Sequence, residues 1–405
     1  MSTFSFTRGL LSVALAAGLS LSGGLASAAE TIKIGVAGPM TGGNAAFGAI
    51  LFRDLLIIPL AGPMTGGNAA FGEQFWRGAS QAADDINAAG GIDGKKIELV
   101  KGDDACEPKQ AVAVANRLID QDKVAAVIGH FCSSSTIPAS EVYADANIVV
   151  ITPGSTNPKV TERNLPTVFR MCGRDDQQGP LAADFIVKEL KAKKIAVIHD
   201  KDTYGQGIAD AMRTRLKELK ADNRVVLYEG LTRGEKDFNA LVTKIKASGA
   251  DAVYFGGLYN EAGPLLRQLR EQGVKAAFLS GDGSLDPAIV TAAGGPQFVN
   301  GAYMTSVREA RNIASSQAVV KKMQAAGFDP AGFTLYAYAS LQALADGMKG
   351  AKTSDGAKLA AWLKAHTVPT VLGPKSWDAK GDLKDTSFSL FVWSPDGTYR
   401  EMAQK

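Results

Sequence analysis

The chain has 405 residues, of which 46% are hydrophobic and 21% are charged, an ordinary balance for globular domains. This length is enough for two or three domains. The formal net charge of +3 is too small to indicate a protein that binds nucleic acid or an anionic membrane surface.

The first 28 residues have the pattern of a secretory signal peptide. Arg8 follows a short polar start, residues 9–21 are mostly apolar and uncharged, and residues 26–28 read Ala-Ser-Ala, the form of a cleavage site. The apolar run is too short to span a membrane comfortably. We therefore predict that residues 1–28 are removed and that the mature protein is exported.

A duplicated segment follows the first predicted strand, Ile32–Val36. The sequence AGPMTGGNAAFG occurs at residues 37–48 and again, 24 positions later, at residues 61–72. The second copy continues directly into a predicted amphipathic helix that begins at Glu73. Both copies have the same local preferences, so tertiary context decides which of them forms the turn between strand and helix.

The segment between the copies offers an alternative strand at residues 56–60, but Pro59 would remove a hydrogen-bond donor from a central position of a sheet. We therefore expect residues 32–36 to keep the strand, the second copy to start the helix, and residues 49–72 to form an outlying insert. Such an insert costs little entropy, because the cost of loop closure rises only logarithmically with length.

The rest of the chain alternates short apolar runs with helical patterns, which predicts an α/β protein with parallel sheets covered on both faces. In a first series we expect strands at residues 96–101, 124–128 and 148–152, and helices at residues 109–121 and 139–146. In a second series we expect strands at residues 194–199, 224–228, 252–257 and 276–280, and helices at residues 181–190, 209–219, 238–248 and 261–273. Ligands of such sheets bind beyond the carboxyl ends of the strands, so two facing lobes would enclose a cleft.

A hydroxyl-rich stretch, GHFCSSSTIPAS at residues 129–140, lies between a predicted strand and a helix that we expect Pro138 to open. The unpaired N–H groups and the dipole of a helix start attract anions, and Ser133 and its neighbours add uncharged donors. The stretch therefore indicates a site for a small anion such as a carboxylate. An ordinary helix cap with spare serines is the alternative that this stretch alone leaves open.

Signatures of catalysis or of a cofactor are absent from the sequence. No glycine-rich dinucleotide turn, phosphate-binding loop or nucleophile elbow is present, and the three histidines have no metal-binding spacing. His130 precedes Ser133 by three residues, but a Ser–His pair also needs an orienting group and an oxyanion site. We expect a hydrogen-bonded loop histidine, no metal, no cofactor and no enzymatic activity.

Three cysteines, Cys106, Cys132 and Cys172, are present in a chain that we expect to be exported, where disulfides form. Cys106 and Cys132 each follow an apolar run, so they can meet at one end of a sheet. A bridge between them would contribute roughly 3 kcal/mol in the loop-entropy account. Cys172 would then be a buried and unreactive thiol.

Seven motifs make the chain resemble the leucine/isoleucine/valine-binding proteins of bacterial uptake systems. They are DDACEPKQAVAVAN from Asp103, IGHFCSSSTIPAS from Ile128, ITPGSTNP from Ile151, GRDDQQGP from Gly173, IAVIHDKDTYGQG from Ile195, GEKDF from Gly234 and GDLK from Gly381. The resemblance covers essentially all of the mature chain except the insert.

The resemblance implies a type I periplasmic-binding fold, with two doubly wound parallel-sheet lobes joined by three crossings. It places residues 31–171 and 306–384 in the N-terminal lobe and residues 172–305 and 385–405 in the C-terminal lobe. It also places the family's disulfide on Cys106 and Cys132. The implied partners are a small amino acid and the membrane permease of an ABC transporter, with no nucleic acid, for a monomer in the periplasm.

The resemblance also implies a set of ligand-binding residues. Ser133 and Thr156 would bind the ligand's carboxylate. Its ammonium group would meet the Gly154 carbonyl, the Thr156 hydroxyl and Asp282, while Tyr204 closes over the ligand. The other implied residues line the same loops and the side-chain pocket: Ser155, Phe131, Cys132, Phe71, Leu258 and Phe333.

Three positions depart from the leucine-binding relatives, which have Glu in place of Asp282 and Tyr in place of Phe71 and Leu258. Here the nearest tyrosine to Leu258 is Tyr259, one residue later. The site for the ligand's carboxylate and ammonium groups, here called the head-group site, is therefore expected to be kept. The shape of the pocket for the ligand's side chain can differ. A ligand sensor or chemoreceptor of the same fold, binding an amide or another amino-acid-like solute, is the alternative function.

Overall fold

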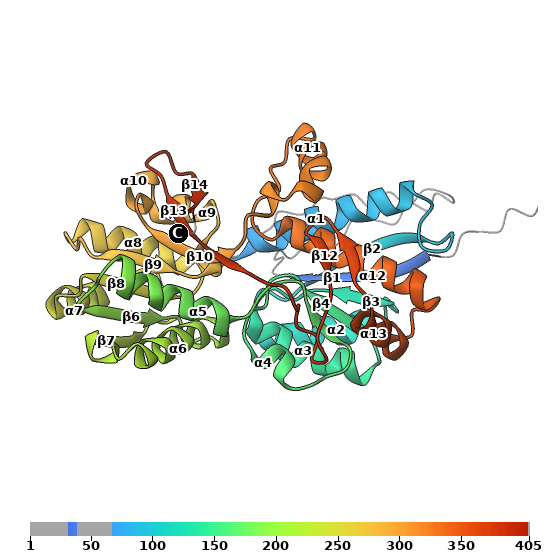
Figure 1. Cartoon of the computed structure of the whole chain (residues 1–405), viewed down its shortest axis with the longest axis horizontal. Helices are drawn as coiled ribbons and strands as arrows, with labels where there is room; N and C mark the ends of the chain where they lie inside the picture. The colour runs from blue at the N-terminus through green and yellow to red at the C-terminus, as the bar shows by residue number, and fades with distance from the viewer. Residues whose placement is uncertain (1–30, 39–66, 404–405) are drawn as a thin grey trace, which may run out of the picture.

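The computed structural model describes residues 31–38 and 67–403, and it forms two α/β lobes that lie side by side (Figure 1). The sheet of the first lobe is parallel throughout and has the order β2 (Lys96–Asp103), β1 (Thr31–Gly38), β3 (Ala126–Ile128), β4 (Val149–Thr152) and β5 (Val168–Arg170). The helices of this lobe are α1 (Ala69–Ala88), α2 (Pro108–Asp120), α3 (Ser133–Asp145), α4 (Lys159–Glu162), α11 (Gln317–Ala325), α12 (Thr334–Ala351) and α13 (Gly356–Ala365). A hairpin, β11 (Val368–Thr370) with β12 (Gly373–Lys375), completes it.

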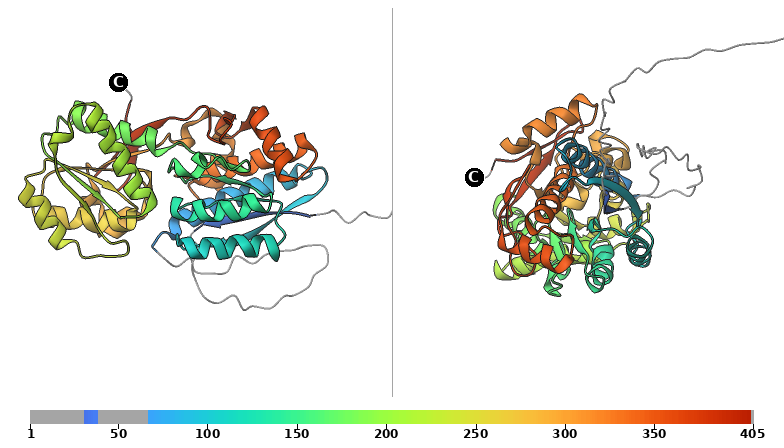
Figure 2. Two further views of the ribbon diagram at one scale, coloured as in Figure 1. Left: turned by 90° about the horizontal axis from the view of Figure 1, so that it is seen from below. Right: turned by 90° about the vertical axis from the view of Figure 1, so that its right-hand side faces the viewer.

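The sheet of the second lobe has seven strands in the order β14 (Tyr399–Glu401), β13 (Phe388–Trp393), β10 (Tyr303–Val307), β9 (Ala277–Ser280), β8 (Ala252–Gly256), β6 (Ile195–His199) and β7 (Val225–Gly230). Its helices are α5 (Asp175–Asp184), α6 (Thr203–Glu218), α7 (Asn239–Ser248), α8 (Tyr259–Glu271), α9 (Ala288–Ala293) and α10 (Pro296–Val299). A π-helical turn at Phe185–Glu189 continues α5. Figure 2 shows helices on both faces of the sheets, and this explains why β3, β4, β6 and β8 are buried along their whole length.

The chain passes between the lobes three times: between β5 and α5, between β10 and α11, and between β12 and β13. Strand β10 runs to Val307, so the lobe boundary predicted at residue 305 falls inside a strand of the second sheet. The other two predicted boundaries fall in connecting segments.

The duplicated segment is divided as the sequence predicts. Strand β1 includes residues 37 and 38 from the first copy, and α1 begins at Ala69 in the second copy. The helix therefore starts four residues before Glu73 and includes Phe71. The expected packing of the insert, residues 49–72, lies mostly outside the described residues.

Several helices begin earlier than the apolar pattern predicts. Helix α3 begins at Ser133 instead of Ala139, α5 at Asp175 instead of Leu181, and α6 at Thr203 instead of Ala209. Pro138 lies inside α3 and does not open it. The N–H groups of the first helical turn have no partners within the helix, and polar side chains are common there. The apolar periodicity of a helix therefore begins only after its first turn.

Candidate ligand-binding cleft

The amino end of α3 supplies hydrogen-bond donors from the first lobe. Ser133 is the first helical residue after Cys132, and its hydroxyl accepts a hydrogen bond from the Asn157 N–H at 3.3 Å. The N–H groups of Ser135 and Thr136 both donate to the Cys132 carbonyl at 2.9 Å. Earlier N–H groups of the helix have no carbonyl to meet within it, so they are available to an anion.

The turn after β4 places Gly154, Ser155 and Thr156 beside this helix start. The Thr156 hydroxyl is buried, and it makes no hydrogen bond of normal geometry with the described residues but is close to the Asp175 carboxylate. A Cβ atom at Gly154 would approach the Phe131 ring to 2.8 Å, so this position requires glycine. Ser155 is turned away into the first lobe, where its hydroxyl donates to the Phe131 carbonyl at 2.7 Å.

From the second lobe, Tyr204 and Asp282 form one hydrogen-bonded unit. The Tyr204 hydroxyl donates to Asp282 Oδ1 at 2.6 Å and accepts from the Gly283 N–H at 3.0 Å. Asp282 Oδ2 is buried and has no partner among the described residues. Burial raises the pKa of Asp282 to about 6, although the bond from Tyr204 acts in the opposite direction. The carboxylate is therefore fixed in place with one oxygen free for a cation.

A second acidic residue, Asp175, lies at the first position of α5 directly after a crossing, and we did not predict it as a site residue. It is fully buried, and no hydrogen bond of normal geometry reaches its carboxylate from the described residues, although the Thr156 hydroxyl is close enough to lower its pKa. Burial raises the pKa of Asp175 well above its usual value, and the neighbouring Asp282 raises it further. The only sequence signal is its place in the motif GRDDQQGP, where the polar neighbours are typical of a loop.

Aromatic rings from the two lobes pack around Phe131, which lines the cleft. Phe71 stacks on Phe131 with ring centroids 3.9 Å apart, and Phe333 packs edge-on against Phe131 at 5.5 Å. Tyr259 reaches across from the second lobe to Phe71 at 5.4 Å. Leu258, the residue before it, is buried and lines the cleft. The structure thus brings together all the predicted apolar residues and adds Tyr259.

Direct contacts hold the lobes together across the cleft. The Ser134 hydroxyl donates to Asp202 Oδ2 at 3.0 Å, and the Asn157 side-chain amide donates to the Thr203 carbonyl at 2.8 Å. The cavity between the lobes, lined by Ser133, Tyr204, Asp282 and their neighbours, has a volume of only about 10 Å³. This is about the space of one water molecule, so a larger ligand enters only if the lobes separate.

A further interlobe contact joins Gln74 to Asp286, whose atoms Nε2 and Oδ2 are 2.5 Å apart. Burial raises the pKa of Asp286 to about 6. Arg233 also crosses the cleft, with Nη2 at 3.5 Å from the Cys132 sulfur and Nη1 at 3.3 Å from Asp202 Oδ2. These residues of the closed arrangement were not predicted, because their sequence surroundings are those of ordinary polar loops.

The predicted structural role of His130 and the predicted pairing of the cysteines are confirmed. His130 is fully buried, with Nδ1 bonded to Asp104 and Nε2 at 3.0 Å from the Tyr143 hydroxyl, so it is a satisfied structural residue. A disulfide joins Cys106 to Cys132 with their Cα atoms 5.4 Å apart. Cys172 is a free, buried thiol, and burial raises its pKa.

Within residues 31–38 and 67–403, no group of three or more His, Cys, Asp or Glu side chains has an arrangement that suits a metal ion. In the same part of the chain, no helix combines the length and the apolar character needed to cross a membrane.

Comparison with known proteins identifies the class. Residues 57–398 match the periplasmic binding protein family, with a start between the two duplicated copies, so the match includes the second copy. The chain is 65% identical to an amino acid binding protein of Pseudomonas aeruginosa, over 99% of this chain and all of that protein. It is 42% identical to the Leu/Ile/Val-binding protein of Escherichia coli, over 91% and 93% of the two chains.

Among solved structures, the chain is similar to a branched-chain amino acid transporter substrate binding protein of Streptococcus pneumoniae in complex with isoleucine. The TM-score is 0.78 at 28% identity, over 92% of this chain and 99% of that one. The chain thus belongs to the periplasmic binding protein family and has its type I fold, as the resemblance implied. The family consists of binding proteins, and this confirms the expectation of a binding protein and not an enzyme.

Proposed function

We propose that this protein is the substrate-binding component of an ABC uptake system and that it captures a branched-chain or related amino acid between its lobes. The observation that carries the proposal is the pairing of a helix start rich in neutral donors with the buried Asp282 carboxylate, which has one oxygen without a partner, and with the buried Asp175 near it. A zwitterionic head group satisfies both sides at once. The names of the 65% and 42% identical relatives support the same ligand class.

In this proposal the ligand's carboxylate binds the Ser133 hydroxyl, the N–H groups at the start of α3 and the Thr156 backbone. The ammonium group binds the Gly154 carbonyl, the Thr156 hydroxyl and Asp282, and Asp175 is added to this set. A buried carboxylate oxygen without a partner costs free energy. An ammonium group that pairs with it therefore gains more binding free energy than the same pairing would give in water. Tyr204 holds Asp282 in place and covers the head group.

The ligand's side chain would lie toward Phe131, Cys132, Leu258 and Gly283, with the rings of Phe71 and Phe333 behind Phe131. These groups favour an apolar side chain. Ser155 would not contact the ligand. It would act indirectly, because its hydroxyl holds the Phe131 carbonyl in place.

The proposal includes the setting of the protein. Residues 1–28 would direct export and be removed, and the mature chain would work as a monomer in the periplasm. The two lobes would close on the ligand about the three crossings and then deliver it to a membrane permease. The periplasmic description of the family supports this setting.

A thermal-shift panel of the twenty amino acids and their side-chain amides tests the proposal. A ligand at about 100 times its Kd adds roughly 2.7 kcal/mol to the stability of the folded state. We expect leucine, isoleucine, valine or a close analogue to raise the melting temperature, and lysine and glutamate to leave it unchanged. A panel in which no amino acid or amide shifts the transition would overturn the proposal.

A further inference from the structure

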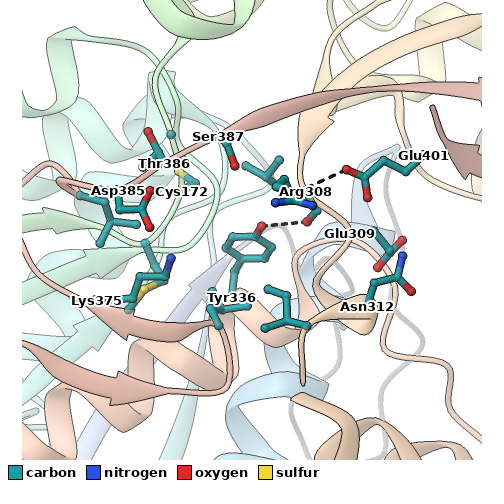
Figure 3. Close-up of a pocket in the computed structure, with 16 residues that line it drawn as sticks. Cys172, Arg308, Glu309, Asn312, Tyr336, Lys375, Asp385, Thr386, Ser387 and Glu401 are labelled. Carbon is teal, nitrogen blue, oxygen red and sulfur yellow. Dashed lines mark hydrogen bonds and ion pairs between the residues drawn. The ribbon is translucent and has the colours of Figure 1, made fainter. Parts of the chain in front are cut away.

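A second and larger cavity, of about 440 Å³, lies at the hinge between the lobes (Figure 3). Each of the three crossings contributes to its lining, through Cys172, Arg308 and Ser387 respectively. The first crossing also contacts the turn after β4, because the Cys172 thiol is 3.6 Å from the Ser155 carbonyl. A volume of this size is typical of small-molecule sites.

The shape of this hinge cavity depends on whether the lobes are open or closed. The crossings are the pivot, so motion that brings the lobes together on the cleft side moves them apart on the opposite side. The structure is closed on the cleft side, where Ser134 and Asp202 are in contact, and in this arrangement the hinge cavity has its volume of about 440 Å³. Opening the cleft would therefore narrow the hinge cavity.

The two sites also share the start of α12. Phe333, at the helix start, packs against Phe131 in the cleft, and Tyr336 lies one helical turn later in the wall of the hinge cavity. Their rings are in contact, with centroids 5.9 Å apart. The Tyr336 hydroxyl donates to the Arg308 carbonyl at 3.0 Å, which ties this helix to the second crossing. A molecule beside Tyr336 thus touches the elements that move on closure.

The charges in the lining indicate the chemistry of a ligand. The carboxylate of Glu309 is neutralised by Arg311, with contacts of 2.9 and 2.7 Å. Lys375, in contrast, is half-buried, and burial lowers its pKa, while the nearby Asp385 carboxylate acts in the opposite direction without forming an ion pair within 4 Å. Figure 3 shows Lys375 and Asp385 on one wall of the cavity and Arg308 facing Glu401 on another.

Apolar groups fill the space between these charges, from Met171, Val307, Ile313, Leu372, Leu383 and the ring of Tyr336. We propose that the hinge cavity is a second binding site, for a small carboxylate with an apolar body, and that its occupation favours the closed arrangement of the lobes. The carboxylate meets Lys375, and the apolar body packs on Tyr336. The coupling to closure rests on the proposed function, whereas the site itself does not.

Calorimetric titration of the full mature chain with benzoate tests this site. We expect benzoate to bind the protein that is already saturated with leucine, and to bind the leucine-free protein more weakly. Because coupling between two sites is reciprocal, saturating benzoate must tighten leucine binding by the same factor, which we expect to be at least about fivefold. Competition between benzoate and leucine, or no benzoate binding to the loaded protein, would overturn the inference.

Three variants locate the site. Lys375→Gln removes the charge that meets the carboxylate and should weaken benzoate binding at least about tenfold. Lys384→Gln changes an exposed lysine outside the cavity and is the matched control. It should leave the benzoate affinity within about twofold of the wild-type value. Ser387→Trp fills the cavity and should abolish benzoate binding while leucine binding persists. Equal benzoate affinity in Lys375→Gln and Lys384→Gln would contradict the site.

The failure of this inference and that of the proposed function give different results. If leucine and its analogues do not bind, the proposed function fails, and the benzoate titrations of the leucine-free variants still test the hinge site. If leucine binds but benzoate does not, only the hinge site is refuted.

Discussion

The two lobes face the cleft with different chemistry. The first lobe presents neutral donors, the Ser133 hydroxyl and the start of α3 with Thr156 nearby, whereas the second presents charged groups, the Asp282 carboxylate with Asp175 near it and Arg233 paired with Asp202. Several neutral donors bind the ligand's carboxylate together, so each hydrogen bond contributes only modestly to the binding free energy. A buried charge without a partner destabilises the empty site. When a ligand of opposite charge binds, that cost is removed, so the ion pair contributes strongly to the binding free energy. The second lobe should therefore dominate affinity, and the first should set orientation.

The largest effect is expected from the carboxylates. Asp282→Asn and Asp175→Asn each remove a charged hydrogen bond to the ammonium group, worth about 1.5–3 kcal/mol, so leucine affinity should fall by about ten- to a hundredfold. Titration calorimetry measures the change. Asp145→Asn, at an exposed aspartate of α3, is the control and should bind as the wild type does. Asp286 would be a poor control, because it bonds to Gln74 across the cleft. Unchanged affinity in Asp175→Asn would remove that residue from the site.

A pH dependence should follow from the second lobe. Asp282, with a pKa raised to about 6, is ionised above that pH and protonated below it, and an ammonium ligand pairs with the ionised form. The Asp282 contribution to leucine affinity should therefore be full above about pH 7 and fall about tenfold by pH 5, and Asp175, whose pKa is also raised, should weaken binding in the same direction as the pH falls. Fluorescence or calorimetric titrations across this range measure the profile, and Asp282→Asn should reduce its pH dependence. A profile that rises toward acid would contradict the assignment.

A smaller effect is expected on the first lobe. Ser133→Ala removes one neutral donor, while the N–H groups of α3 remain, so affinity should fall by about two- to tenfold. The loss should be smaller than for either carboxylate when both are measured under the same conditions. If Ser133→Ala were the more damaging change, the proposed division of labour between the lobes would be reversed.

The sequence predicted β1 to β4 and β6 to β9, helped by the continuous buried apolar runs of β3, β4, β6 and β8, but it did not predict β5 or β10 to β14. The starts of α3, α5 and α6 were predicted about six residues late, because first turns carry polar residues with no apolar period. Asp175 was missed for this same reason. Its burial follows from the crossing that precedes it, which no local pattern reveals.

The ring contact between Phe71 and Tyr259 shows a related limit. Both residues were named in the sequence analysis, but the contact between their rings was not predicted. That contact depends on the closed position of one lobe against the other. The disulfide could be assigned through the resemblance, while the residues alone left its pairing open.

The smallest effect is expected from the insert. A chain lacking residues 49–72 keeps one copy of the duplicated segment between β1 and the helix, and it should bind leucine with unchanged affinity. Parallel titrations of the two chains measure this, with solubility as a second readout. Loss of binding in the shortened chain alone would give the insert a role in the cleft.

The clamp on a zwitterionic head group is tested most directly by titrating the mature protein with leucine, with 4-methylpentanoate, which lacks the ammonium group, and with 3-methylbutylamine, which lacks the carboxylate. We predict that leucine binds and that each analogue binds at least about a hundredfold more weakly, because each leaves one side of the cleft without its partner. Binding of either analogue as tightly as leucine would contradict the account.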